Sequence, residues 1–149
     1  MAEYIMEEMR KLNYLLSEID AAYHEASQTL GLSDSAMQIL YVICNHGESC
    51  LLSEICSLSG TSKQTINSAL RKLEAEGIVR LETLVGRRKM VCLTECGKDM
   101  VNNTVARLIE IENDVFGSWK KQERDLYLAL TQRYLTSFKE KIRELSART

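Results

Sequence analysis

Proline is absent from the 149-residue sequence, and no run of about 18 apolar residues occurs in it. Without proline, low-complexity segments or repeats, the chain shows no flexible linker between domains. Without a long apolar run, it has no segment that could span a membrane, and we expect no membrane partner. The acidic start, with Glu3, Glu7 and Glu8 near Arg10 and Lys11, does not have the pattern of a signal peptide. We therefore expect a cytoplasmic protein.

Histidine is scarce, and neither His24 nor His46 lies in a motif typical of catalysis. The chain also lacks a glycine-rich phosphate loop and an H-E-x-x-H sequence. We therefore predict that the protein is not an enzyme and needs no cofactor. The five cysteines are odd in number and form no zinc-type pair of C-x-x-C motifs. The sequence thus predicts neither a disulfide framework nor a metal site.

The formal net charge of −2 hides an uneven distribution along the chain. Residues 1–60 contain two Lys and Arg against nine Asp and Glu, a net charge of −7. Residues 61–98 contain eight against four, net +4, and residues 99–149 contain nine against eight, net +1. Because docking on a polyanion depends on the local field, the middle segment is the candidate for contact with nucleic acid.

The stretch from Ser53 to Gly77 predicts two short helices joined by a tight turn. Ser53 is the predicted start of the first helix, which must stop near Gly60. Thr61 or Ser62 is the predicted cap of the second helix, which ends at Gly77. Apolar residues of the second helix recur at spacings of three and four: Ile66, Ala69, Leu70 and Leu73. This pattern predicts a helix-turn-helix.

The other face of the second helix has the composition of a surface that contacts DNA. It presents Ser62, Lys63, Gln64, Thr65, Asn67, Ser68 and Arg71. These side-chain types can hydrogen-bond base edges or phosphates, and no acidic residue lies between Glu54 and Glu74. An ordinary solvated helix face is the alternative interpretation.

A basic hairpin is predicted directly after this helix. Ile78–Thr83 alternates as a strand does, and Met90–Leu93 is a second apolar strand candidate. The loop between them contains three consecutive cations, Arg87, Arg88 and Lys89. A helix-turn-helix followed by such a hairpin is a winged helix. Its second helix enters the major groove, while the basic tip reaches the backbone or the minor groove.

These motifs resemble those of the MarR family of bacterial transcriptional regulators. The matching runs are Ser53–Arg80 and Gly86–Gly97, and the family's small residue between the motif helices corresponds to Cys56. The resemblance implies a dimeric regulator that binds double-stranded DNA, and we expect it to act as a repressor. The family wing usually carries Asp-x-Arg. This chain keeps the arginine as Arg87 but has Val85 in place of the aspartate.

Long apolar seams at both ends of the chain predict a homodimer. Residues 3–30 form one helix candidate with a heptad-like seam: Ile5, Met9, Leu12, Leu16, Ile19, Tyr23, Ala26 and Leu30. A last helix over Gln122–Leu145 carries a second stripe. A small winged helix offers too little surface to bury both, although packing of the first seam on it is the alternative. Two-fold symmetry would place two recognition helices about 34 Å apart and predicts a pseudopalindromic operator.

We therefore expect residues 1–149 to form a single unit, mainly α-helical with a small β-hairpin wing. Within it, residues 1–31 and 118–149 are the expected dimerisation helices and residues 32–97 the winged helix DNA-binding region. Ser33 is the predicted cap of its first helix, Asp34–Cys44. Residues 98–117 are expected to belong to a connecting helix, which Thr94 caps and which runs from Glu95 toward Trp119.

The resemblance also implies modulation by a small aromatic or phenolic ligand. Tyr14, Met37 and Tyr41 are the candidate lining residues of its pocket, and a place in the hydrophobic core is the alternative for each. A winged helix that binds another protein instead of DNA is a further hypothesis, because fold does not fix function.

The cysteines offer a second regulatory hypothesis, a thiol-based redox switch. Cys50 and Cys96 are expected to be accessible, and Cys96 lies in the first turn of a predicted helix, where the dipole lowers a thiol pKa. Cys44, Cys56 and Cys92 are expected to be small buried apolar residues.

Overall fold

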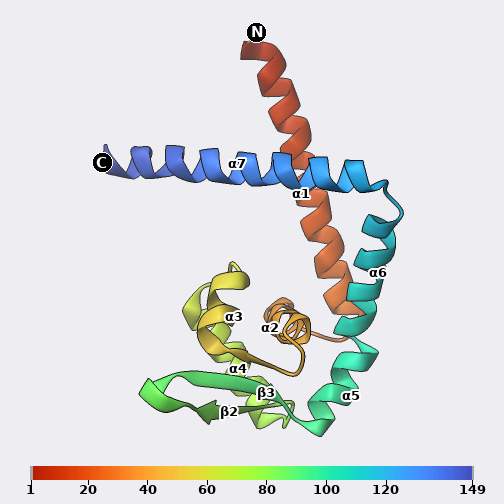
Figure 1. Cartoon of the computed structure of the whole chain (residues 1–149), viewed down its shortest axis with the longest axis vertical. Helices are drawn as coiled ribbons and strands as arrows, with labels where there is room; N and C mark the ends of the chain where they lie inside the picture. Colours follow the sequence, from red (N-terminus) through yellow and green to blue (C-terminus); the bar gives the residue numbers. More distant parts are fainter. Residues whose placement is uncertain (1, 149) are drawn as a thin grey trace. The chain divides into compact units, whose positions relative to one another are not determined.

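The structure is a computed structural model that describes residues 2–148, with side chains described from residue 5 onward. Its elements are α1 (Ala2–Thr29), α2 (Asp34–Asn45), β1 (Ser49–Leu51), α3 (Leu52–Leu58), α4 (Lys63–Ala75), β2 (Val79–Thr83), the 3-10 turn η1 (Val85–Arg87), β3 (Lys89–Leu93), α5 (Glu95–Asn103), α6 (Val105–Gly117) and α7 (Lys121–Ala147) (Figure 1). This architecture confirms the prediction of a mainly α-helical protein with a small β wing. The chain divides into two compact units, one up to Ile109 and one from Glu110 onward.

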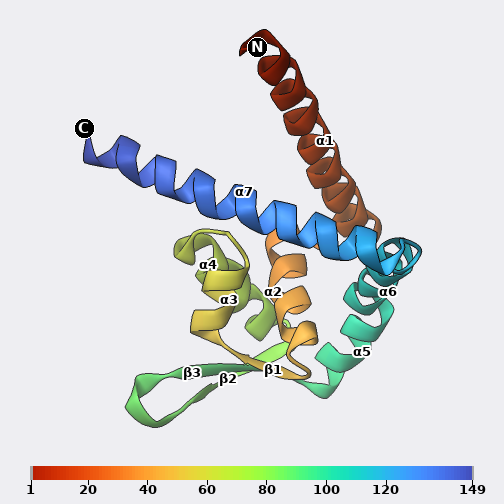
Figure 2. The same ribbon diagram turned by 45° about the horizontal axis from the view of Figure 1, so that its top comes forward.

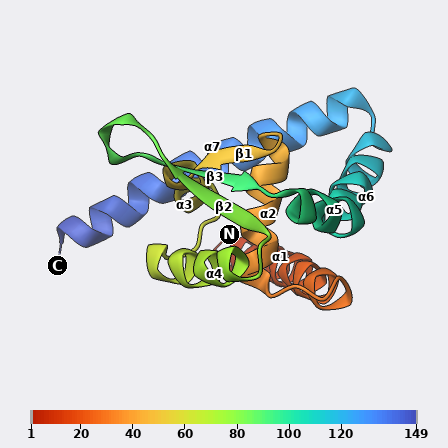
Figure 3. The ribbon, with the colours of Figure 1, turned by 90° about the horizontal axis from the view of Figure 1, so that it is seen from below.

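The first unit contains the winged helix. Its sheet has the order β1-β3-β2 with both pairs antiparallel, so β3 lies in the middle (Figure 3). Helices α2, α3 and α4 lie on one side of this sheet (Figure 2). The apolar stripe of α2, including Ile39, Leu40 and Ile43, is fully buried between them. Burial of this stripe against α3, α4 and the sheet stabilises the unit, since each fully buried side chain is worth about 1.5–3 kcal/mol.

Three of the predicted helix caps are present. Ser33 Oγ accepts the Ala36 N–H at 3.1 Å, Ser62 Oγ accepts the Thr65 N–H at 3.2 Å, and Thr94 Oγ1 accepts the Gly97 N–H at 3.0 Å. The prediction for α3 is wrong, because Ser53 does not cap it. The Glu54 carboxylate instead accepts the Leu51 N–H at 3.3 Å, which starts the helix one residue earlier.

A tight contact anchors the end of the wing on the turn that follows α4. The Thr94 N–H donates to Ile78 O at 3.0 Å, and Thr94 Oγ1 donates to Gly77 O at 2.5 Å. A Cβ atom placed on Gly97 would lie only 2.0 Å from Ile78 O. Only glycine therefore allows α5 to approach the backbone of Ile78, directly before β2, this closely. This contact explains why the run Leu93-Thr94-Glu95-Cys96-Gly97 closes the wing.

The helix predicted from Glu95 toward Trp119 is in fact two helices. Thr104 interrupts it with φ −128° and ψ −89°, and its Oγ1 donates to Met100 O at 2.7 Å. A threonine hydroxyl that bonds back to the preceding turn competes with the helix's own hydrogen bonds, which explains the break. The predicted break at Gly117–Ser118 is present, because α6 ends at Gly117.

The long helices at the two ends leave most of their apolar side chains exposed. Along α1, Ile5, Leu16 and Ile19 are exposed, whereas Ala26 and Leu30 near its end pack against the winged helix core. In the second unit, α7 has no buried residue among those described. None of the described helices is long and apolar enough to cross a membrane.

Candidate nucleic-acid interface

Helix α4 turns its apolar residues inward and its predicted DNA-contacting residues outward. Ile66, Leu70 and Leu73 are buried against the core. Six of the seven predicted contact residues are exposed, and Asn67 is half-buried: Ser62, Lys63, Gln64, Thr65, Asn67, Ser68 and Arg71. The face therefore exists as the sequence predicts it.

Two of these residues already have local partners. Ser62 caps the helix, and its hydroxyl donates to Thr65 Oγ1 at 2.8 Å. By contrast, the Lys63, Gln64 and Arg71 side chains form no hydrogen bond or ion pair within the described residues. They are therefore available for an external ligand, and long polar side chains of this kind reach base edges and phosphates.

The wing tip has an unusual backbone. Gly86 and Arg87 both take positive φ, at 78° and 63°, and the Leu84 N–H donates to Arg88 O at 2.6 Å to close the loop. Positive φ is uncommon for a residue other than glycine and costs about 1–3 kcal/mol. Such strain is often found where a side chain must point at a ligand, and here it occurs at the predicted minor-groove arginine.

Val85 is the most exposed large apolar residue of the tip, with 96% of its surface accessible. It occupies the position at which the family pattern has an aspartate. No acidic side chain pairs with Arg87 within the described residues. The backbone turn sets where the Arg87 side chain leaves the loop, and no ion pair holds its guanidinium among the described residues.

A hollow of about 590 Å³ joins the wing tip to the start of α4. Its polar lining consists of Ser53, Ser57, Lys63, Arg87, Arg88 and Lys89, without any Asp or Glu. The structure thus brings one cation of the recognition helix next to the three of the wing. Ser53 and Ser57 were not among the predicted contacts, although their four-residue spacing places both hydroxyls on one face of α3. Hydroxyls beside cations are typical phosphate ligands.

The three predicted effector-binding residues do not share a pocket among the described hollows. Met37 is buried in the core, Tyr41 is half-buried and packs against that core, and Tyr14 on α1 is 63% exposed. For Met37 the structure favours the core interpretation. Neither of the two hollows that border the wing includes any of the three.

The structure separates the two candidate redox cysteines. Cys96 is exposed in the first turn of α5, as predicted. The prediction that Cys50 is accessible is wrong: it is only 2% exposed, because it is the central residue of β1 and faces the core. Burial, together with the hydrogen bond to Glu54, raises the pKa of the Cys50 thiol to about 12. A thiol with so high a pKa is a poor nucleophile at neutral pH.

The other three cysteines are largely covered. Cys92 is buried, and Cys44 and Cys56 are half-buried residues packed against the core. All five cysteines are free thiols.

Comparison with known proteins agrees with this geometry. Residues 30–89 match the family model described as MarR family. A MarR family regulator from Neisseria meningitidis has a similar structure, with a TM-score of 0.76 and 19% identity over 92% of this chain and 96% of that one. A MarR family regulator from Silicibacter pomeroyi aligns with a TM-score of 0.65 and 23% identity over 85% of this chain and 86% of that one.

Bordetella bronchiseptica BpsR, whose DNA binding is regulated by 6-hydroxynicotinic acid, aligns with a TM-score of 0.62 and 19% identity over 83% of this chain and 97% of that one. No curated protein matches the sequence significantly. The matched segment covers α2 through the tip of the wing, which is the part that carries the polar α4 face and the basic hollow. Residues 30–89 of the chain thus match the MarR family, and the chain has the winged helix-turn-helix fold of the MarR family regulators to which it is similar.

Proposed function

We propose that the protein is a sequence-specific repressor that binds a pseudopalindromic double-stranded DNA operator as a homodimer. The observation that carries this proposal is the basic hollow, which Lys63 of α4 and the cations of the wing line together and whose lining contains no Asp or Glu. Binding to the phosphates of a duplex requires cations that no acidic residue neutralises. The outer face of α4, beside the hollow, carries side chains of the types that contact bases.

The test is a selection of genomic fragments by the purified full-length protein, followed by binding measurements over a salt series. We expect a fragment with two half-sites one helical turn apart, bound with a steep dependence on salt. Binding that is independent of salt, or no preference among fragments, would contradict the proposal. It would favour the alternative of a winged helix that binds another protein.

The exposed seams support the homodimer part of the proposal. In the first unit α1 leaves Ile5, Leu16 and Ile19 exposed, and in the second unit α7 leaves Leu126, Leu130, Phe138 and Ile142 exposed. Rows of large apolar side chains of this length are usually covered by a partner. We assign residues 1–31 and 118–149 to this contact. Light scattering at micromolar concentration should give twice the mass of the chain, and a folded monomer would refute the assignment.

A charge placed in a seam sharpens this test. Leu16→Glu and Leu130→Glu should each weaken dimerisation, because a dimer would bury an unpaired carboxylate. Arg133→Glu, on an exposed position of the same α7 helix, is a control for the change in charge. A dimer that tolerates Leu16→Glu and Leu130→Glu as well as it tolerates Arg133→Glu would show that these seams are not the interface.

We further propose that a small aromatic ligand modulates DNA binding. Support comes from the similarity to BpsR, whose DNA binding responds to 6-hydroxynicotinic acid. A titration of the DNA complex with 6-hydroxynicotinic acid and with benzoic acid tests whether ring acids in general release the duplex. Treatment of the DNA complex with peroxide tests the alternative hypothesis of a thiol-based redox switch. If it abolishes binding and Cys96→Ser prevents this, the switch is a thiol.

A further inference from the structure

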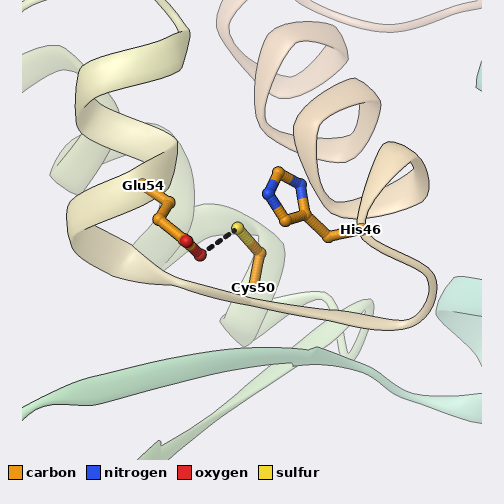
Figure 4. Close-up of side chains that lie close together, drawn as sticks. All are labelled: His46, Cys50 and Glu54. Atoms are coloured by element: carbon orange, nitrogen blue, oxygen red, sulfur yellow. Dashed lines mark hydrogen bonds between the residues drawn. The ribbon is translucent and has the colours of Figure 1, made fainter.

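Three potential metal ligands converge where α2, β1 and α3 meet. His46 directly follows α2, Cys50 is the middle residue of β1, and Glu54 lies in the first turn of α3. One donor atom from each residue lies within 4.8 Å of the other two. Figure 4 shows the imidazole, the sulfur and the carboxylate turned toward the same point.

The His46 ring is held in a ligand-ready orientation. Its Nδ1 lies 2.8 Å from the Val42 carbonyl oxygen, which can only accept a hydrogen bond. Nδ1 therefore carries the proton, and Nε2 carries the lone pair. The ring nitrogen remote from α2 faces Cys50 and Glu54 (Figure 4). A hydrogen bond from the non-ligating nitrogen to a carbonyl is how proteins usually fix a metal-binding histidine.

The other two donors are already close to metal-site spacing. Cys50 Sγ donates to Glu54 Oε2 at 3.3 Å. Ligands at about 2.0–2.3 Å from a tetrahedral zinc ion are about 3.3–3.8 Å apart. The sulfur and the oxygen meet this distance as they stand. The His46 donor lies within 4.8 Å of both, so a displacement of this nitrogen by about 1 Å would complete the set.

The charge at this place also suits a cation. Within the described part of the chain, Glu54 forms no ion pair with Lys or Arg. Its Oε2 accepts only the Cys50 thiol and the Leu51 N–H, at 3.3 Å each. Glu54 is half-buried and Cys50 is buried, so a positive ion between them would meet a carboxylate that solvent screens only in part.

We propose that His46, Cys50 and Glu54 form a binding site for a divalent metal ion, with Zn²⁺ as the best match. Sulfur, imidazole nitrogen and carboxylate oxygen together are ligands that zinc accepts in tetrahedral geometry. When the ion binds, the Cys50 S–H bond breaks, the proton passes to the solvent, and a metal–sulfur bond forms without any oxidation. Water completes the fourth position from the exposed His46 side.

This site is independent of the DNA-binding proposal, although its position gives it a structural consequence. The ion would tie the start of α3, the first helix of the helix-turn-helix, to the end of α2 and to β1. Strand β1 pairs with β3 of the wing through Cys50 and Val91. A bound ion would therefore stabilise the base of the wing against unfolding.

The experiment titrates the reduced full-length protein with Co²⁺ and then displaces it with Zn²⁺, with a zinc-binding chromophore as competitor. Co²⁺ bound to a thiolate gives a sulfur-to-metal charge-transfer band, and tetrahedral Co²⁺ gives intense visible bands. We expect one ion per chain, release of one proton, and a rise in Tm with Zn²⁺. His46→Gln should weaken Zn²⁺ binding more than about 100-fold, and Cys50→Ser should remove the charge-transfer band.

The chain provides matched controls, because it has only one other histidine. His24→Gln and Cys96→Ser should bind Zn²⁺ as the wild type does. His46 is exposed, so His46→Gln should stay folded even if the buried Cys50→Ser does not. Wild-type binding no tighter than that of His46→Gln would overturn the proposal. Loss of binding in His24→Gln or Cys96→Ser, with His46→Gln unaffected, would overturn it as well.

Discussion

The two hollows that border the wing have the same volume, about 590 Å³ each, and opposite electrostatics. The first holds Lys63, Arg87, Arg88 and Lys89 and no acidic residue. The second holds Arg80 and Lys98 together with Glu48, Glu82 and Glu95. In the second hollow every cation is paired: Lys98 lies 2.9 Å from both Glu48 and Glu95, and Arg80 contacts Glu82.

The difference lies in how the cations are paired: those of the second hollow form ion pairs within the protein, and those of the first hollow do not, among the residues that the structure describes. Paired cations on an exposed surface gain little from each other, about 0–1 kcal/mol, and they attract no polyanion. Cations without partners repel one another and raise the local positive potential, which attracts a polyanion. The comparison therefore predicts that DNA contacts the first hollow and not the second.

The largest expected effect concerns the contact that anchors the end of the wing. Gly97→Ala would place a Cβ atom 2.0 Å from Ile78 O, so the contact between α5 and the start of β2 must open. We expect a loss of about 3 kcal/mol or more in the free energy of unfolding, measured by urea denaturation. Gly117→Ala, which meets no atom within 4 Å, is the control and should change stability by less than about 1 kcal/mol. Equal effects of the two substitutions would contradict the role of Gly97.

Neutralising the first hollow should come next in size. The triple variant Arg87→Ala, Arg88→Ala, Lys89→Ala removes up to three phosphate contacts. Its salt slope should fall by about 0.9 per contact, which corresponds to roughly 100-fold weaker binding at 0.15 M salt. The loss should be similar for all duplex sequences, because phosphate contacts carry no sequence information.

The second hollow provides the matched control. The double variant Arg80→Ala, Lys98→Ala removes two cations, against three in the triple variant, but breaks only surface ion pairs, so affinity and salt slope should change little. Fluorescence anisotropy over a salt series measures all of these variants. If the double variant loses as much affinity as the triple variant, the distinction between the two hollows is wrong.

Substitutions on the α4 face should change the sequence preference of DNA binding, whereas substitutions in the wing should change affinity for all sequences. Gln64→Ala, Asn67→Ala or Arg71→Ala, where the side chain contacts a base, should cost about 1–3 kcal/mol on the operator. Each such variant should also relax the preference at one position of each half-site. Binding to a library of operator variants measures both. A uniform loss over all variants, as expected for Arg87→Ala, would reassign that residue to a phosphate contact.

How far the sequence predicts this arrangement depends on the range of the interactions involved. The caps at Ser33, Ser62 and Thr94 and the apolar stripe of α4 are local patterns, and the structure confirms them. The burial of Cys50 depends on the pairing of β1 with Val91, far along the chain, so a loop-like sequence context gave the wrong prediction.

The convergence of donor groups is equally non-local. Lys63 and Arg87 are brought together by the fold of the sheet over α3, and no spacing in the sequence indicates it. His46, Cys50 and Glu54 do recur every four residues, but they span a helix end, a strand and a helix start. A helical period of four would therefore group these three residues, although they do not lie on one helix. Local sequence patterns predict the helices and strands, whereas the assembly of a binding site depends on tertiary contacts.

The smallest expected effect concerns Val85, where the family pattern has an aspartate. An aspartate at this exposed position could pair with Arg87 and hold it toward the groove, and an exposed ion pair is worth about 0.2–1 kcal/mol. Val85→Asp should therefore tighten DNA binding by up to about 5-fold, despite the added negative charge. The gain should vanish in an Arg87→Ala background, and Val85→Asn should not reproduce it. Weaker binding of Val85→Asp in both backgrounds would mean that repulsion from phosphate dominates and that the strained turn at Gly86 and Arg87 already positions the guanidinium. The backbone would then have replaced the carboxylate as the brace of this wing.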